Sequence, residues 1–396
     1  MNKKLSIEEQ VRIAINRFTA TSDGKWPRPF ARLDNLNVDR ATKSRAIKDA
    51  FIEGHVKIVA TDPGGARPIR DLRTEQRIRE RFGVTSIVLR PIIEGADRKS
   101  ADSLNDAIHR QLGVAMGRFI SQGAILRDDD RIACSSGRSC YHTVHYLAGA
   151  LLTSCLKRIT LISMAGNLHP RHYASLGALK LDADFNTQEF ARWFNNEVDA
   201  HYVGRHAIPQ SNVAALRGQN DALSDSTWRD PVHVAIYGVG ILRPGHRFYS
   251  VVEHPHPDFD PILSDLRALK QISDEFSADG YCPVADIANH LLYIHPPSGI
   301  HVPARVQTRI RTLIERVNQK TLTVTATHIE KIRNGVLIAG TPQKAAAVCQ
   351  LIREQRVGYL CVDFELASRL LEFGDPPPAG GLQPVKPRLV NPSKRG

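Results

Sequence analysis

The segment Val336-Leu-Ile-Ala-Gly-Thr-Pro-Gln-Lys-Ala-Ala-Ala347 runs from an apolar stretch through a tight turn into a helical stretch. Its apolar start predicts a buried strand at Val336–Ala339, and the residues after the turn predict a helix at Lys344–Glu354. A second apolar strand is predicted at Gly358–Val362. A strand, a helix and another strand in succession are typical of the crossover unit that builds a parallel sheet.

The same alternation continues outward through residues 84–374 and predicts an α/β fold. Further strands are predicted at Ser86–Leu89, Arg131–Ser135, Arg158–Met164, Val232–Tyr237 and Leu322–Thr325. Further helices are predicted at Leu104–Ser121, Tyr141–Ser154, Thr187–His201 and Pro261–Phe276. Ligands of such sheets bind at the carboxyl ends of the strands, so the loops that follow the strands are where we expect a site.

Three of these loops carry suitable chemistry. Ser135-Ser-Gly-Arg-Ser139 opens a helix, so backbone N–H groups, hydroxyls and a guanidinium can converge there on an anion. Gly340 to Lys344 repeats the arrangement, with a lysine in the first turn of the next helix. Gly238-Val-Gly240 lacks the Gly-x-Gly-x-x-Gly pattern and the acidic residue of a dinucleotide site. We therefore expect the loops to bind an anionic ligand, and we expect no cofactor. The alternative for each loop is that it is a plain turn with no ligand.

The amino-terminal segment predicts a winged helix-turn-helix. A helix at Glu8–Ala20 is followed by a short helix at Phe30–Leu36 and a tight turn. Asp39 can cap a third helix that ends at Gly54, and His55–Ala60 alternates like the strand of a wing. This order of elements places the third helix where it can enter a major groove.

Positive charge is concentrated at the same end of the chain. The 396 residues carry a formal net charge of +12, and residues 1–82 hold 18 Lys and Arg against 11 Asp and Glu. Residues 83–374 hold 31 against 29, so the body is almost neutral. A basic module on a neutral body indicates a polyanionic partner, a merely soluble basic surface being the alternative. The residues expected to contact double-stranded DNA are Arg40, Thr42, Lys43, Ser44, Arg45, Lys48 and Lys57.

The remaining features limit the class of protein. No apolar run approaches the length of a membrane span, and the amino terminus lacks a signal-peptide core, so we expect a cytoplasmic protein. The six cysteines contain no Cys-x-x-Cys pair and are interpreted as reduced core thiols. The close histidine pairs have no partners at zinc spacing, so no metal site is expected. Six of the 23 prolines lie in residues 375–396, which predicts a disordered basic tail.

These segments together resemble the SorC-type sugar-binding transcriptional regulators, a branch of the DeoR group. The resemblance covers roughly residues 8–373 and is carried mainly by Val336–Ala347 and Gly358–Leu371. Supporting matches are Ile132–Ser139, Ala235–Gly240, Gly280–Ile287 and Arg81–Val84. It implies a winged helix-turn-helix at residues 1–62 and a linker helix at 63–83, and it does not extend to the tail predicted at 375–396. After the linker, residues 84–374 would form a Rossmann-like effector domain with the fold of sugar-phosphate isomerases and deaminases.

The resemblance also implies a site. In that family the loop matching Ser136–Ser139 and the lysine matching Lys344 hold the effector's phosphate, and the acid matching Asp286 binds sugar hydroxyls. By its own pattern, an acid before an apolar run is typical of a helix cap. The expected effector-binding residues are Ser136, Gly137, Arg138, Ser139, Gly240, Asp286, Gly340 and Lys344.

The implied function is regulation of a carbohydrate catabolic operon. The protein would bind operator DNA as a homodimer or homotetramer and change its affinity when a sugar or sugar phosphate binds; it would not be an enzyme or a membrane protein. One alternative is a sugar-phosphate isomerase or deaminase with an accessory basic domain, because fold does not fix function. Another is a regulator that senses a free polyol or a sugar conjugate.

Overall fold

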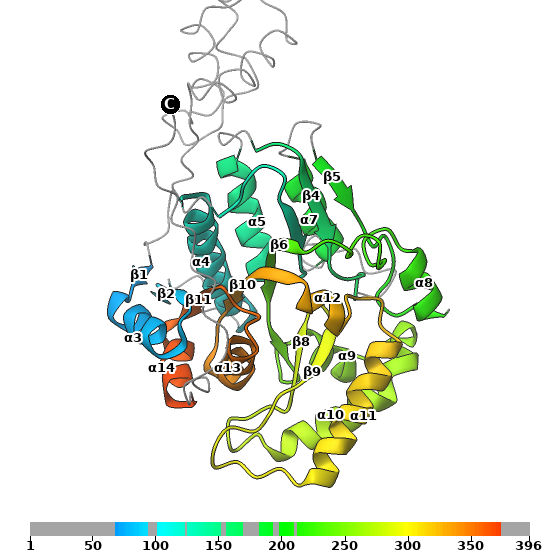
Figure 1. The fold of residues 1–396 in the computed structure, drawn as a ribbon. Helices are drawn as coiled ribbons and strands as arrows, with labels where there is room; N and C mark the ends of the chain where they lie inside the picture. The colour runs from blue at the N-terminus through cyan, green and yellow to red at the C-terminus, as the bar shows by residue number, and fades with distance from the viewer. Residues whose placement is uncertain are drawn as a thin grey trace, which may run out of the picture.

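The computed structural model describes residues 68–93, 101–122, 125–151, 156–168, 182–192, 198–209 and 212–373 (Figure 1). The expected helix-turn-helix at residues 1–62 and the tail at 375–396 lie outside these ranges. So do the expected DNA contacts, which are Arg40, Thr42, Lys43, Ser44, Arg45, Lys48 and Lys57.

An eight-stranded sheet forms the centre of the described chain, in the order β1-β2-β11-β10-β6-β3-β4-β5. Its strands are β1 (Ile69–Arg70), β2 (Thr85–Arg90), β3 (Arg131–Cys134), β4 (Ile159–Ser163), β5 (Val198–His201), β6 (Val232–Gly238), β10 (Ile332–Ala339) and β11 (Tyr359–Asp363). Every neighbouring pair is parallel except β1 and β2. The chain runs outward from β3 to β5 and then returns to β6 on the other side of β3. The strand order therefore reverses between β3 and β6, which is where such sheets bind ligands.

Alternate side chains of each central strand pack on opposite faces of the sheet. On β6, Val234 and Ile236 join one apolar cluster, whereas Ala235 and Tyr237 join the other. Three helices cover the first face: α4 (Ala101–Gln122), α5 (Arg138–Leu151) and α7 (Ala183–Ala191). The second face carries α3 (Leu72–Phe82), α12 (Ala326–Glu330), α13 (Ala345–Arg353) and α14 (Phe364–Phe373). Burial on both sides explains why the central stretches of these strands are apolar.

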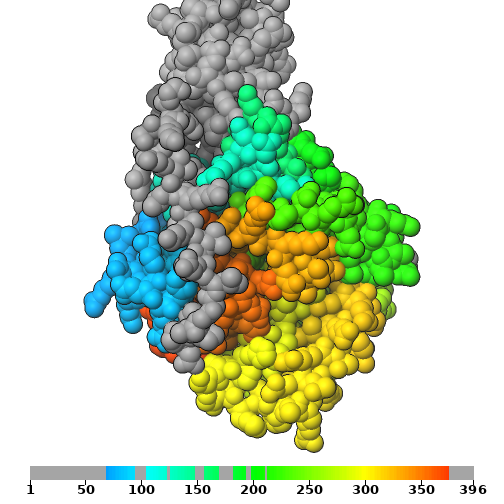
Figure 2. Space-filling model, in the orientation of Figure 1, coloured from blue at the N-terminus to red at the C-terminus, as the bar shows by residue number. Residues whose placement is uncertain are grey.

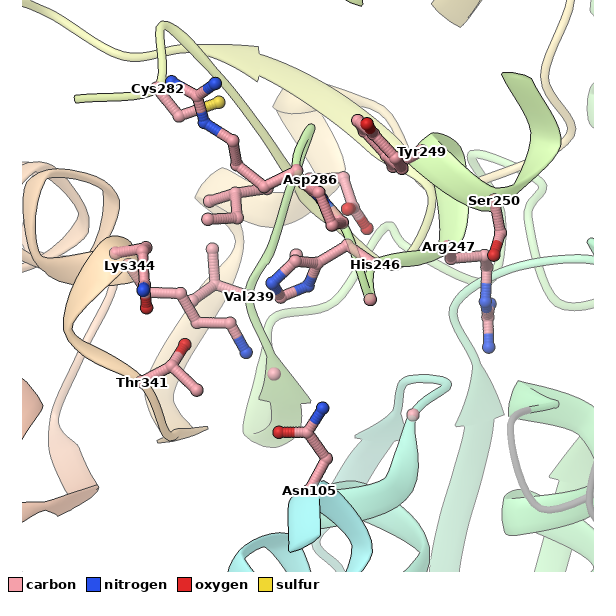
Figure 3. A pocket seen from close by; sticks show the side chains of 18 of the residues that line it. Asn105, Val239, His246, Arg247, Tyr249, Ser250, Cys282, Asp286, Thr341 and Lys344 are labelled. Atoms are coloured by element: carbon pink, nitrogen blue, oxygen red, sulfur yellow. The ribbon is translucent and has the colours of Figure 1, made fainter. Parts of the chain in front are cut away.

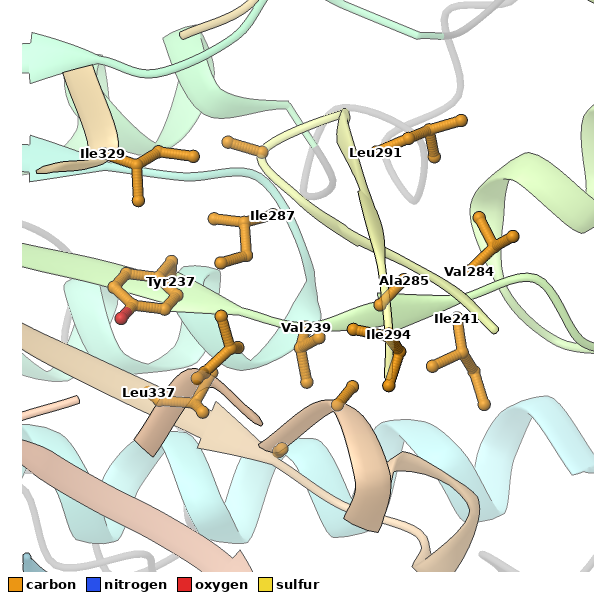
Figure 4. Close-up of a cluster of buried hydrophobic side chains, with 14 of the residues drawn as sticks. Tyr237, Val239, Ile241, Val284, Ala285, Ile287, Leu291, Ile294, Ile329 and Leu337 are labelled. Atoms are coloured by element: carbon orange, nitrogen blue, oxygen red, sulfur yellow. The ribbon is translucent and has the colours of Figure 1, made fainter. Parts of the chain in front are cut away.

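The segment between β6 and β10 forms a smaller lobe. It holds an antiparallel sheet of β7 (Gly240–Ile241), β8 (Val284–Ile287) and β9 (His290–Tyr293), with helices α9 (Arg247–Glu253), α10 (Asp260–Glu275) and α11 (Ala304–Gln319). Figure 4 shows Val239, Ile241 and Val284 of this lobe in the same cluster as Tyr237 and Leu337 of the large sheet. This shared core fixes the position of the lobe, whose α10 and α11 form the lower end of the molecule in Figure 2.

Most predicted elements are confirmed, often with bounds that differ by a few residues. The helix expected before Gly83 is α3, where the Asp71 side chain accepts a hydrogen bond from the Thr74 N–H (3.0 Å) and Gly83 ends the helix with a φ of 70°. The five described cysteines are buried, as expected for core residues. No described helix has both the length and the apolar character needed to cross a membrane.

Two predictions are wrong. Leu322–Thr325 forms no strand and makes only an isolated bridge between Thr323 and Ala165. The helix expected at Thr187–His201 ends at Ala191 in α7, and residues 198–201 form β5 instead. β5 pairs in parallel with β4, so a long-range backbone ladder overrides the local helical pattern.

Candidate effector site

The three ligand-suited loops meet at one edge of the sheet. They follow β3, β6 and β10, which are neighbours, so their carboxyl ends lie side by side. A cavity of about 1080 Å³ opens at this edge (Figure 3). Of the expected effector-binding residues it is lined by Ser136, Gly137, Arg138, Ser139, Gly240, Asp286 and Lys344. Gly340 is not among the lining residues, although its neighbour Thr341 is.

The loop after β3 leads directly into helix α5. Gly137 has a φ of 116°, which lets the chain turn sharply so that the helix begins at Arg138. The Ser139 hydroxyl lies 2.7 Å from Nδ1 of His109 on α4, so it is already engaged within the protein. Burial, together with Lys344 and Arg138, lowers the pKa of His109 to about 3 and keeps its imidazole neutral. His109 therefore contributes a neutral polar group to the cavity wall.

Lys344 is the most buried cation at this edge. It ends the short 3-10 helix at Pro342–Lys344, which continues into α13, and its side chain reaches into the cavity with only 4% of the residue exposed (Figure 3). Burial lowers its pKa to about 8, against the opposing effect of Asp286 and Asp363. Among the described residues its ammonium group has neither an ion-pair nor a hydrogen-bond partner. A buried charge without such a partner is costly, so we expect the Lys344 ammonium group to attract an anion into the cavity.

Asp286 and Gly240 lie opposite each other on β8 and β7. A Cβ at position 240 would lie 1.9 Å from Oδ1 of Asp286, so the glycine makes room for the carboxylate. Burial raises the pKa of Asp286, while Arg247 and Lys344 act against this. The helix-cap interpretation of Asp286 is wrong, because β8 places this residue in a strand facing the cavity.

Arg247 is a residue that the sequence analysis missed. It begins α9, and its Nη1 donates hydrogen bonds of 3.0 Å to both the Ser136 hydroxyl and Oδ1 of Asn289. Burial lowers its pKa, against the opposing effect of Asp286 and Asp182. Arg247 thus ties the loop after β3 to the small lobe. Nothing in the sequence singled it out, since it lies 111 residues from Ser136.

His246 and Asn105 were also missed. Figure 3 shows His246 in the middle of the cavity and Asn105 reaching toward it from α4. Burial and the nearby Lys344 lower the pKa of His246 well below its usual value, so this ring too is neutral. The cavity therefore combines neutral hydrogen-bonding groups with cations and the carboxylate of Asp286, while its other acidic lining residue, Asp274, is paired with Arg243 and Lys270.

The first two residues of the loop after β10, Gly340 and Thr341, have different structural roles. A Cβ at Gly340 would lie 3.0 Å from Oδ2 of Asp363 and 3.2 Å from Cγ2 of Ile108, so this glycine permits close packing against α4. Thr341 has a φ of 77° and a ψ of 131°, a backbone conformation that costs a residue with a side chain roughly 1–3 kcal/mol. Its N–H donates to Oδ2 of Asp363 at 2.6 Å. Gly340 is therefore a packing residue, and Thr341 occupies the strained position.

This arrangement suits a small polar ligand that carries a negative charge. Lys344 and Arg138 can hold an anion near the start of α5, where backbone N–H groups are free of helical partners. Asp286 can accept hydrogen bonds from hydroxyl groups. Within the described ranges no group of His, Cys, Asp and Glu is arranged to hold a metal ion.

Comparison with known proteins relates this fold to solved regulators. No protein-family model and no curated protein matches the sequence. The full-length sorbitol operon regulator SorC from Klebsiella pneumoniae matches with a TM-score of 0.50 and 18% identity, over 93% of this chain and 100% of that one. A domain of a transcriptional repressor from Vibrio fischeri matches with a TM-score of 0.50 and 12% identity, over 76% of this chain and 98% of that one. The described α/β domain therefore has the fold of the SorC-type transcriptional regulators.

Proposed function

We propose that this protein is a transcriptional regulator of a carbohydrate catabolic operon, controlled by a sugar or sugar phosphate that binds the cavity at β3, β6 and β10. The observation that carries the proposal is the placement of Lys344 and Asp286 on one cavity, within a fold shared with a sorbitol operon regulator. A cation can hold the phosphate while a carboxylate accepts hydrogen bonds from the hydroxyls.

The effector would contact most of the expected residues in distinct ways. Arg138 and Lys344 attract the anionic group, and Ser136 and Gly137 offer backbone N–H groups at the start of α5. Gly240 acts indirectly by leaving space for Asp286, and Gly340 acts by packing against α4. Arg247 is added to the site as the residue that orients Ser136.

The DNA-binding part of the proposal rests on the sequence. Residues 1–62 form the helix-turn-helix in this proposal, residues 63–83 link it to the effector domain, and the assembly is a cytoplasmic homodimer or homotetramer. Support for coupling comes from α3, which is packed against the effector domain. Ile78 and Phe82 are buried in its core, and the Arg81 guanidinium donates to the Leu371 carbonyl at 2.8 Å. A change in the domain can therefore displace the linker helix, through a coupling free energy of about 1–3 kcal/mol.

Mobility-shift titration with the promoter DNA beside its own gene tests the proposal. We expect the affinity for this DNA to differ by roughly 5- to 150-fold between the protein alone and the protein with the correct sugar or sugar phosphate. Failure to bind any DNA from that neighbourhood would refute the DNA-binding part. Lys344→Ala should remove the response to effector and leave DNA affinity nearly unchanged, whereas equal loss of both would show a structural role.

Two further assays separate the alternatives. Calorimetry with paired free and phosphorylated sugars distinguishes a sugar-phosphate sensor from a sensor of free polyols. Incubation with ribose 5-phosphate and glucosamine 6-phosphate tests the isomerase or deaminase alternative, which gains no support from relatives that are named as regulators. Turnover of either compound would contradict a purely regulatory role.

A further inference from the structure

Thr341 stands where the backbone favours glycine. Its φ of 77° and ψ of 131° lie in a region that residues with a Cβ rarely adopt. Pro342 follows it and excludes the helical alternative, because the proline ring clashes with a helical residue before it. The Asp363 carboxylate then holds the Thr341 N–H at 2.6 Å, which keeps the strained conformation in place. The loop therefore imposes this backbone shape, whichever residue occupies position 341.

The Thr341 side chain has no visible structural task that would offset this strain. It heads the short helix at Pro342–Lys344 but makes no side-chain capping hydrogen bond. Its hydroxyl has no hydrogen-bond partner anywhere in the part of the chain that the structure describes. The neighbouring Gly340 already provides the close packing against Ile108 and Leu112 on α4. A glycine at 341 would thus suit the protein alone better than the threonine does.

The side chain is directed at the cavity instead. Thr341 lines it together with Lys344, and Figure 3 shows both side chains reaching from the same loop toward the same space. Asn105 lies across from them on α4, and its amide likewise makes no hydrogen bond to any described residue. These two neutral hydrogen-bonding groups line the same cavity as the buried Lys344, whose ammonium group forms no ion pair with any described residue. Strained residues kept at a site usually serve that site.

We propose that Thr341 contacts the ligand directly, donating a hydrogen bond from its hydroxyl to the phosphate group that Lys344 holds. This inference rests on the proposed function and deepens it, because it assigns the residue that selects a phosphate-bearing ligand. A hydrogen bond to a charged oxygen is stronger than one to a neutral group, so losing it costs more for a phosphorylated sugar than for the free sugar.

Three substitutions of the full-length chain test the assignment, with inorganic phosphate, glucose 6-phosphate and glucose as probes in calorimetry. Thr341→Val keeps the shape and the strain but lacks the hydroxyl, and we expect it to bind both phosphate probes about tenfold more weakly. Thr341→Ser keeps the hydroxyl and should stay within about twofold of the natural protein. Thr341→Gly should melt at a higher temperature without ligand, since the strain is relieved, and bind phosphate weakly. Thr308→Val on the exposed face of α11 is the matched control and should change neither property.

The possible outcomes distinguish a failure of the Thr341 assignment from a failure of the regulator proposal. If Thr341→Val binds phosphate as tightly as the natural protein, this inference is wrong and the regulator proposal stands. A lower melting temperature for Thr341→Gly would show that the side chain is structural and would also overturn it. If the natural protein binds glucose or another free sugar but no phosphate probe, Thr341 does not select phosphate, although a sugar sensor remains. If it binds no sugar and no phosphate, both proposals fail.

Discussion

A β-carbon on residue 240 would lie 1.9 Å from Oδ1 of Asp286. The two residues are paired across β7 and β8, so neither can move without disturbing the small sheet. The position of the carboxylate in the cavity therefore depends on the absence of a side chain at Gly240.

Gly240→Ala should displace the Asp286 carboxylate and abolish the response to effector. Overlap of this size also destabilises the protein, by about 1–3 kcal/mol as for other overpacking. Urea denaturation measures the stability, and mobility-shift titration measures the response. Gly218→Ala on α8 (Val213–Gln219) is the control, because nothing lies near its added Cβ. A normal response in Gly240→Ala would show that Asp286 does not contact the effector.

Ligand affinity should depend on pH through Lys344. Its pKa of about 8 means that the ammonium group loses its proton as the pH rises through this value. Affinity for a phosphorylated ligand should therefore fall by up to about tenfold between pH 7 and pH 9, because the protonated fraction of Lys344 falls by that factor. Calorimetry over this range measures it. Lys344→Met should bind weakly with little dependence on pH, and a similar decline in that variant would assign the titration to another group.

The stability of the ligand-free protein should change with pH in the opposite direction. The folded pKa of Lys344 is lowered from 10.5, so the unfolded chain binds more protons between about pH 8 and pH 10.5. The contribution of this lysine to stability is therefore fully present above about pH 10.5, where both states are deprotonated. It is lost as the pH falls through about 8, where the folded state must also take up the proton. We expect the natural protein to gain stability relative to Lys344→Met between pH 8 and pH 10. Parallel curves for the two proteins would contradict this.

Asn289 should be important for stability as well as for the site. It follows Ala288 in the turn between β8 and β9, where both residues have positive φ values of 66° and 50°. Its side chain accepts from Arg247 and donates to the Gly166 carbonyl at 3.0 Å each, and the residue is 1% exposed. Asn289→Ala should lower the free energy of unfolding by about 2–4 kcal/mol, because two buried hydrogen bonds are lost.

Urea denaturation measures this loss. Gln355→Ala is a suitable control, because Gln355 is exposed and has a similar φ of 59° but no comparable buried hydrogen bonds. An equal loss in both variants would attribute the effect to the backbone conformation and not to the Asn289 side chain.

The central strands were predictable because both faces of the sheet are buried. β3, β6 and β10 each contain a run of apolar residues, at 132–134, 234–237 and 336–339, and such runs are visible without knowledge of their neighbours. β5 contains Asp199 and His201 and lies at the sheet edge, and β8 contains Asp286, so neither is an unbroken apolar run. Their strand conformation depends on pairing with distant segments, which local patterns do not contain.

The residues of the candidate site also include some that local sequence patterns predicted and some that they did not. Lys344 and the loop at Ser136–Ser139 were predictable, because each follows an apolar strand and precedes a helix. Arg247, His246 and Asn105 were not, because they reach the cavity only after the small lobe and α4 fold against the sheet.

By itself the sequence determined the α/β class, the loops that carry anion-binding groups and the uneven distribution of charge, because these follow from local composition and spacing. Only the tertiary structure decided that three loops share one cavity, that Gly240 makes room for Asp286, and that Thr341 is strained beside Lys344. Each of these depends on strand order or on contacts between residues far apart in the chain. Distances of that kind are set by the packing of the whole core and are not encoded in any one segment.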